Sequence, residues 1–136
     1  MTPVAELTDT FAVAGQIQPS DVAEFARQGY QVLICNRPDD EEMNQPSMDA
    51  IEAACGPAGI TLVRYPVTAM SFPGDDLAAM EDAMSGDVKT LAYCRSGARS
   101  ANLWVATLSG DDRTAAAQRA QQFGIPLTFV MQLGFS

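Results

Sequence analysis

Residues 89–104 read Lys-Thr-Leu-Ala-Tyr-Cys-Arg-Ser-Gly-Ala-Arg-Ser-Ala-Asn-Leu-Trp, an apolar segment followed by a glycine-bearing turn and a helical segment. The residues up to Tyr93 have the short apolar pattern of a buried strand. The turn begins at Cys94, and Gly97 supplies the backbone freedom that a tight turn needs. A helix is expected to follow to about Leu108. A strand that passes directly into a helix is typical of an α/β protein.

Strand and helix patterns alternate on both sides of this segment. Further strands are expected at 11–14, 31–36 and 61–67. Helices are expected at about 20–29, 47–56, 77–84 and 114–123, where apolar or small residues recur at helical spacing. Gly56 and Pro57 are expected to interrupt the second helix, and the last ten residues fit a short helix or an ordered tail.

This alternation implies parallel strands joined by right-handed crossover connections. No repeat, low-complexity tract or linker divides the chain, so residues 1–136 are interpreted as one domain. In such sheets, ligands bind beyond the carboxyl ends of the strands. Cys94 follows a strand directly and is therefore expected at that end of the sheet.

The composition is typical of a soluble globular protein. Of the 136 residues, 47% are apolar and 18% are charged. No apolar stretch approaches the roughly 20 residues that a membrane span needs. The net charge of −9 argues against nucleic-acid and anionic-membrane partners. The first residues lack a basic start and an apolar stretch, so no signal peptide is expected and the cytoplasm is the expected location.

Two features of the composition restrict the chemistry. The chain has no histidine, which excludes His-based triads, Cys-His pairs and His-ligated metal sites. Its three cysteines, Cys35, Cys55 and Cys94, have no C-x-x-C spacing, so a reducing compartment is expected. We expect neither a metal ion nor a cofactor. Any catalysis must therefore depend on Cys, Arg, Ser or carboxylate side chains.

The turn after Tyr93 has the features of an anion-binding loop with a nucleophile. Backbone N–H groups around Gly97, together with the helix N-terminus, would form a nest for an anion. Arg95 and Arg99 add positive charge, and this setting favours the nucleophilic thiolate of Cys94 without a histidine base. The alternative is a buried structural cysteine in a βα turn. The coincidence of strand, glycine, two arginines and helix favours the nucleophile.

The loop Cys94-Arg-Ser-Gly-Ala-Arg99 resembles the active-site loop of rhodanese-type sulfurtransferases, in which four residues separate Cys from Arg. The wider chain resembles a bacterial family described both as tyrosine-phosphatase-like and as a sulfurtransferase. That family also occurs fused to a persulfide dioxygenase of the metallo-β-lactamase type, in β-lactamase-hydrolase-like proteins. The matching stretches lie at 11–16, 36–39, 45–47, 65–67 and 93–104. The resemblance implies a compact tyrosine-phosphatase-like α/β fold with a central parallel sheet of about four strands flanked by helices.

Loop length separates the two activities. Tyrosine phosphatases have five residues between Cys and Arg, whereas this chain has four, and Ser100 occupies the sixth place after the cysteine. A shorter loop makes a smaller cradle, which suits the terminal sulfur of a persulfide better than a phosphoryl group. A phosphatase also needs an acid for its leaving group. Asp75 and Asp76 are candidates, but acids in the first turn of the following helix are the favoured interpretation.

The favoured function is therefore sulfur transfer, with cysteine-dependent hydrolysis of a phosphate ester through a phosphocysteine as the alternative. The Cys94 thiolate would take the outer sulfur of thiosulfate or a small persulfide and pass it to a thiol or cyanide. Arg99 would bind the anionic donor and order the loop. The remaining loop residues would bind substrate: Arg95 at the rim, the backbone of Ser96, Gly97 and Ala98, and the Ser100 hydroxyl donating to the cysteine sulfur. A third interpretation is an inactive anion-binding or docking module.

Other residues at the same sheet edge have two interpretations each. Arg37 binds substrate or pairs with the acids at 39–42, a stretch interpreted as a solvated loop rather than a metal site. Cys35 is a small core residue or, less simply, a resolving thiol for Cys94. Cys55 is expected in the core. The expected partners are a small anionic sulfur donor or phosphate ester and a persulfide dioxygenase of the metallo-β-lactamase type.

Overall fold

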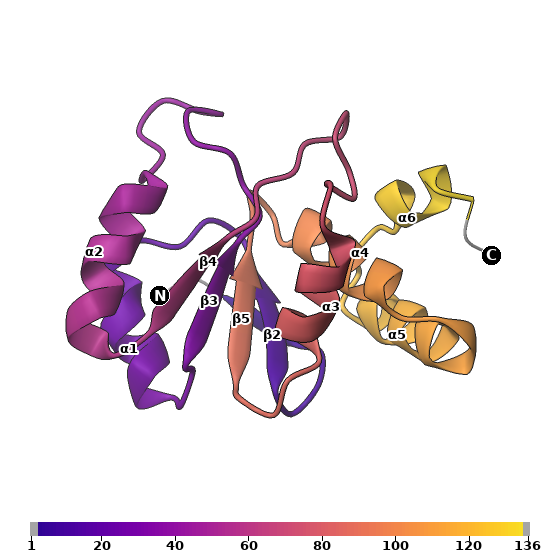
Figure 1. The fold of residues 1–136 in the computed structure, drawn as a ribbon, viewed down its shortest axis with the longest axis horizontal. Coiled ribbons are helices and arrows are strands. Elements are labelled where there is room, and N and C mark those ends of the chain that lie inside the picture. The colour runs from indigo at the N-terminus through magenta and orange to yellow at the C-terminus, as the bar shows by residue number, and fades with distance from the viewer. Residues whose placement is uncertain (1–2, 135–136) are drawn as a thin grey trace.

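The computed structural model describes residues 3–134, which form a five-stranded sheet with helices on both faces (Figure 1). The strands are β1 Val4–Glu6, β2 Phe11–Ala14, β3 Val32–Cys35, β4 Thr61–Arg64 and β5 Thr90–Tyr93. Their spatial order is β1-β2-β5-β3-β4. The last four of these run parallel, and β1 pairs antiparallel with β2. The predicted α/β fold with a central parallel sheet of about four strands is confirmed, and an antiparallel edge strand is added to it.

The helices divide between the two faces of the sheet. A 3₁₀ turn, Pro19–Asp21, leads into α1, Val22–Arg27, and α1 packs beside α2, Met48–Ala58. The other face carries α3 Leu77–Met84, α4 Ala98–Thr107, α5 Gly110–Gln122 and α6 Thr128–Gln132. Figure 1 shows α1 and α2 on one side of the strands and α3 to α6 on the other.

Alternate residues of the central strand β5 face the two helical layers, as the period of two in a strand requires. Ala92 lies in the core that includes α3 and α4 residues, whereas Leu91 and Tyr93 lie in the core that includes α1 and α2 residues. The neighbouring strand β2 contributes Phe11, whose ring stacks on Trp104 with centroids 5.8 Å apart. Strand β5 is thus covered on both faces and paired on both edges, which makes a rigid support for the turn after Tyr93.

Several boundaries differ from the sequence-based expectations. Helix α2 starts at the predicted N-cap, where Ser47 Oγ accepts the Ala50 N–H, but continues through Pro57. Pro57 lies in the last turn, where its missing N–H costs one backbone hydrogen bond near the helix end, and the helix ends at Gly59 in the left-handed conformation (φ 75°). The strand expected at 61–67 ends as β4 at Arg64. The chain beyond it stays tied to β3, and the Tyr65 N–H donates to the Cys35 carbonyl at 2.9 Å.

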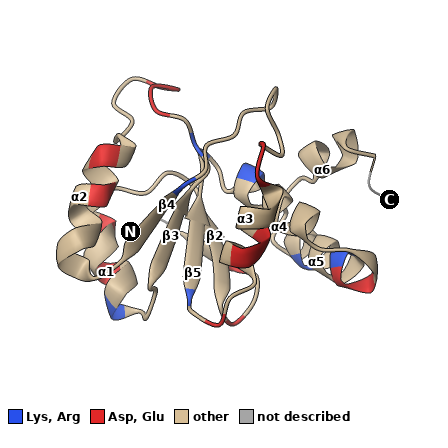
Figure 2. Cartoon of the chain, in the orientation of Figure 1, with Lys and Arg blue, Asp and Glu red and all other residues tan. Residues whose placement is uncertain are grey.

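The last ten residues contain a short helix, α6, within the described part of the chain; residues 135–136 lie outside it. None of the helices formed by residues 3–134 is long and apolar enough to cross a membrane. Figure 2 shows basic segments where strands end at the upper edge of the sheet, with an acidic segment in the loop above them. This edge holds the carboxyl ends of the parallel strands and the turn after β5.

Candidate active site

The turn from Cys94 to Ala98 joins β5 to α4 and wraps around the Cys94 sulfur. Gly97 adopts the left-handed conformation (φ 92°), and its N–H donates to Cys94 Sγ at 3.1 Å. Gly97 is also the N-cap residue of α4, so the positive end of that helix faces the sulfur. The Ser96 Oγ accepts the Ala98 N–H at 3.4 Å within the same turn. The predicted strand–turn–helix arrangement around Cys94 is confirmed.

The end of β2 supports this turn from the side. The Cys94 N–H donates to the Ala14 carbonyl at 3.3 Å, and the Gln16 N–H donates to the Arg95 carbonyl at 3.2 Å. A Cβ atom at Gly97 would lie 3.4 Å from the Ala14 carbonyl carbon, which leaves little room for a side chain. Two strand ends therefore hold the turn in one conformation.

Cys94 itself exposes none of its surface. The side chains of Arg95 and Ser96, by contrast, lie on the surface directly beside it. A donor that reaches the Cys94 sulfur must therefore displace part of the shell formed by the turn and its neighbours.

Arg99 lies on the first turn of α4 and is held by residues from two other loops. Its Nη1 and Nη2 donate to the two carboxylate oxygens of Glu41, each at 2.8 Å, and Nη1 also donates to the Val67 carbonyl at 2.9 Å. The hydrogen bonds to Glu41 raise the pKa of Arg99, and burial opposes them. Reciprocally, the bonds from Arg99 lower the pKa of Glu41. The predicted loop-ordering arginine thus has a carboxylate partner that the sequence did not reveal.

Arg37 is the second arginine at this edge, and only 2% of it is exposed. Its Nε donates to Glu41 at 2.9 Å, its Nη2 to Glu42 at 2.5 Å and its Nη1 to Gln16 at 3.0 Å. Of the two interpretations from the sequence, the structure shows the one in which Arg37 pairs with the acidic stretch. Arg95 is the third arginine; 66% of its side chain is exposed, and its Nε lies 3.2 Å from Glu42.

The acidic stretch is therefore more than a solvated loop. Glu41 and Glu42 bind the three arginines around the cysteine turn. Asp39 accepts the Met48 N–H at 2.9 Å at the start of α2, and Asp40 is exposed. Residues 3–134 contain no group of three or more His, Cys, Asp and Glu side chains arranged to hold a metal ion.

The sequence predicts that the Ser100 hydroxyl donates to the Cys94 sulfur. In the structure it donates instead to Asn36 Oδ1 at 2.8 Å. Asn36 is fully buried at the end of β3, and its Nδ2 donates to the Tyr65 carbonyl at 3.0 Å. A buried amide must satisfy its hydrogen bonds, and Ser100 is the partner within reach. The pair ties α4 to the ends of β3 and β4. The only hint of it in the sequence is the position of Asn36 directly after a buried strand.

The other two cysteines are buried free thiols. Cys35 Sγ donates to the Arg37 carbonyl at 3.2 Å, and burial raises the pKa of the Cys35 thiol. Cys55 packs in the core beneath α2, and burial there raises its pKa to about 11. Both are core residues, as expected; a resolving role for Cys35 stays a prediction.

Asp76 caps α3, and its Oδ1 accepts the Ala79 N–H at 3.2 Å. The interpretation of this acid as part of a helix start is thus confirmed for Asp76, and its not serving as a leaving-group acid stays a prediction. The Tyr65 hydroxyl braces the same segment: it donates to the Pro73 carbonyl at 2.7 Å and accepts the Asp76 N–H at 3.1 Å. Burial raises the pKa of the Tyr65 hydroxyl.

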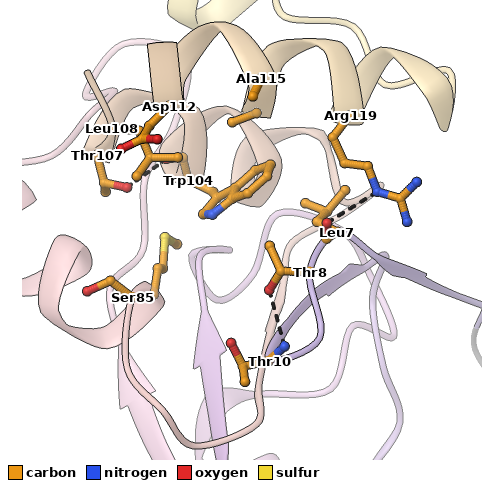
Figure 3. Close-up of a pocket in the computed structure, with 12 residues that line it drawn as sticks. Leu7, Thr8, Thr10, Ser85, Trp104, Thr107, Leu108, Asp112, Ala115 and Arg119 are labelled. Atoms are coloured by element: carbon orange, nitrogen blue, oxygen red, sulfur yellow. Dashed lines mark hydrogen bonds between the residues drawn. The ribbon is translucent and has the colours of Figure 1, made fainter. Parts of the chain in front are cut away.

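A surface hollow of about 520 Å³ lies away from this turn (Figure 3). Figure 3 shows Leu7 and Thr8 between Thr10, which precedes β2, and Arg119 of α5, with Trp104 to one side. Thr10 marks the amino end of the parallel strands, whereas Cys94 follows their carboxyl end. The hollow is therefore separate from the chemistry-bearing loop.

The parallel sheet, the nucleophile-bearing turn and the arginine on the following helix define a cysteine-based, tyrosine-phosphatase-like domain. The family model for the phosphatase-like domain of beta-lactamase hydrolase-like proteins matches residues 4–111, and the chain belongs to this family. A Beta-lactamase hydrolase-like protein of Xylella fastidiosa (strain Temecula1) is 34% identical over 102 residues, which cover 74% of this chain. The same match covers 24% of that relative, so the chain spans about a quarter of its length.

Solved structures show the same fold. A proposed phosphatase of Neisseria meningitidis Z2491 superposes with a TM-score of 0.69 and 29% identity, covering 86% of this chain and 87% of its own. A proposed mouse dual specificity phosphatase, complexed with zinc tungstate, has a TM-score of 0.62 and 21% identity, covering 97% of this chain and 84% of its own. The family description and the Neisseria structure favour the phosphatase alternative, and the expected sulfurtransferase name is not confirmed by them. The mouse structure shows the fold alone.

Proposed function

We propose that the chain transfers sulfane sulfur through a persulfide on Cys94. The observation that carries this proposal is the size of the turn: four residues separate Cys94 from Arg99, and the Gly97 N–H already lies 3.1 Å from Sγ. We expect a turn this short to leave room for one further atom on the sulfur. The outer sulfur of a persulfide is one atom, whereas a phosphoryl group brings three oxygens that each need a donor.

The surroundings of the turn agree with a leaving group that departs as an anion. Asp76 uses a carboxylate oxygen to cap α3, so it is engaged in holding the start of that helix. Sulfite or a thiolate needs no proton to leave, whereas an alkoxide leaving from a phosphate ester does. The arrangement thus supports sulfur transfer with Arg99 and the backbone from Arg95 to Ser100 as the anion-binding groups.

In the proposed first step, the Cys94 thiolate attacks the outer sulfur of the donor. The bond between that sulfur and the rest of the donor breaks, and its electron pair leaves on sulfite or a thiolate. The Cys94 persulfide then passes its outer sulfur to a thiol, or to cyanide in a test reaction. The curated relatives are about four times as long as the matched region. We propose a persulfide dioxygenase of the metallo-β-lactamase type as the partner that consumes the sulfur.

A cysteine-dependent phosphatase is the second candidate, favoured by the family description and by the Neisseria structure. In that reaction Cys94 would carry a phosphoryl group, and Arg99 would bind its oxygens. The two candidates use the same nucleophile and differ in the atom that is attacked, so they are separated by the group found on Cys94.

The test is intact-mass spectrometry of the reduced protein after brief exposure to thiosulfate and, separately, to glutathione persulfide. The proposal expects a gain of one sulfur atom, about 32 Da, that cyanide removes. Cys94→Ser should abolish the gain, whereas Cys35→Ser, which alters a buried thiol outside the turn, should keep it. No sulfur gain with either donor would overturn the proposal, and hydrolysis of an aryl phosphate blocked by vanadate would establish the phosphatase.

A further inference from the structure

Five charged side chains form one connected network around the cysteine turn. Glu41 accepts hydrogen bonds from Arg37 Nε and from both terminal nitrogens of Arg99. Glu42 lies against Arg37 Nη2 and Arg95 Nε. The two carboxylates therefore occupy five N–H-bearing nitrogens on the three guanidinium groups nearest the site. A substrate anion must therefore compete with Glu41 and Glu42 for hydrogen bonds from these arginines.

This network sets the charge that the site can accept. Three guanidinium groups against two carboxylates leave one positive charge, and the Cys94 thiolate of the reactive chain offsets it. The neighbouring acids do not change this balance strongly, because Asp39 faces the N-terminus of α2 and Asp40 is exposed to solvent. Arg37 is almost completely buried, and Arg99 is largely so. An unmatched charge beside these two buried groups is costly, whereas Glu42 and Arg95 are partly exposed to solvent.

We propose that Glu41 and Glu42 restrict this site to donors whose reacting end carries a single negative charge. This inference rests on the proposed sulfur transfer and narrows its substrate class. A monoanion, such as an alkyl persulfide or a thiosulfonate, brings a single negative charge beside the two carboxylates. A dianion, such as thiosulfate or a phosphate monoester, brings two negative charges, so the two carboxylates repel it about twice as strongly. Persulfides are therefore the donor class, and thiosulfate is a poor substitute.

Two small donors separate charge from shape. Thiosulfate is a dianion, and methanethiosulfonate is the same tetrahedral sulfur centre with one charged oxygen replaced by a methyl group. The Cys94 thiolate would attack the outer sulfur of either molecule, and the sulfur–sulfur bond would break. The products would be the Cys94 persulfide with sulfite in one case and with methanesulfinate in the other. Charge and atoms balance in both reactions without a further reactant.

The experiment measures binding rather than turnover, in chains that carry Cys94→Ser so that no reaction occurs. Both anions are titrated while the backbone amide signal of Gly97 is followed by NMR. Methanethiosulfonate should bind at least about tenfold more tightly than thiosulfate. Adding Glu41→Gln or Glu42→Gln should strengthen thiosulfate binding about tenfold. Methanethiosulfonate binding should strengthen only about threefold, because the interaction energy scales with the product of the charges.

Asp40→Asn is the matched control. It removes the same charge from the same loop, Asp40 is exposed, and its positive φ of 64° is one that asparagine adopts readily. It should change either affinity less than about twofold, because solvent screens an exposed carboxylate. Thermal unfolding of each variant confirms that the fold is kept.

Three outcomes would overturn the inference: equal affinity for the two anions, no binding of either anion, or weaker thiosulfate binding after Glu41→Gln. The last would mean that Glu41 serves to orient Arg99 instead. Because the binding comparison does not depend on sulfur transfer, a failure of the mass-spectrometric test with the wild-type chain would not be confused with any of these results.

Discussion

Glu41 accepts hydrogen bonds from Arg99 at both carboxylate oxygens, each 2.8 Å from a different terminal nitrogen, although 58 positions separate the two residues in the chain. Such a two-pronged pair fixes the plane of the guanidinium group. The Val67 carbonyl accepts a third bond from the same side chain. The first turn of α4, the loop after β3 and the segment after β4 are thereby locked around the cysteine turn.

Replacing this arginine should remove more than a charge. Arg99→Lys keeps the positive charge but cannot make the paired bonds to Glu41, because an ammonium group is a single point of donation. Loading of sulfur onto Cys94 from a persulfide donor should fall about 100-fold, the scale seen when one positioned anion donor is lost. Initial rates of persulfide formation by mass spectrometry would measure it.

Arg27→Lys is the matched control, since Arg27 is exposed on α1 and pairs only with Glu24 of the same helix among the described residues. Its loading rate should stay within about twofold of the wild type. Full activity of Arg99→Lys would show that Arg99 neither binds the donor nor orders the turn.

The same pair makes stability depend on acidity in a defined direction. Arg99 lowers the pKa of Glu41 in the folded protein, while an unfolded glutamate titrates near 4.3. The ionised pair therefore stabilises the fold above about pH 4.3, and this contribution is lost as pH falls through the folded pKa. Urea unfolding should show wild type more stable than Glu41→Gln at pH 6, with the difference shrinking steadily below pH 4.3. A difference that stays constant from pH 6 to pH 3 would contradict this origin.

The extent to which the site could be predicted from the sequence differs between its parts. The strand, turn and helix around Cys94 follow from local apolar patterns and from the glycine, so residues 89–108 alone predict them. The pairing of Glu41 with Arg99 and of Asn36 with Ser100 joins residues that are far apart in the chain. No periodicity encodes such pairs. Strand β1 was missed because three residues at a sheet edge give too short a pattern.

The buried thiols should be poorly reactive in the native protein. Burial raises the pKa of Cys55 to about 11 and raises that of Cys35 as well. Only about one Cys55 thiol in a thousand would then be ionised at pH 8, and the thiolate is the reactive form. Labelling with N-ethylmaleimide at pH 8 should be at least about 100-fold slower at both sites than in urea-unfolded protein. Rapid native labelling of Cys35, read from its peptide, would instead show a thiol accessible enough to resolve a Cys94 persulfide.

Gly74 should be the glycine least tolerant of a side chain. It has a φ of 81°, and a Cβ atom there would overlap the Tyr65 hydroxyl that bridges the Pro73 carbonyl and the Asp76 N–H. Gly74→Ala therefore adds a steric clash and breaks a brace on the segment before α3, in addition to backbone strain of about 1–2 kcal/mol. We expect a loss of about 3 kcal/mol in the free energy of unfolding, measured by urea titration.

Gly59→Ala is the matched control, because Gly59 has a similar φ of 75° and no atom within 4 Å of the new Cβ position. That variant should lose only the strain, and equal losses in the two variants would show that the Tyr65 brace does not hold this segment.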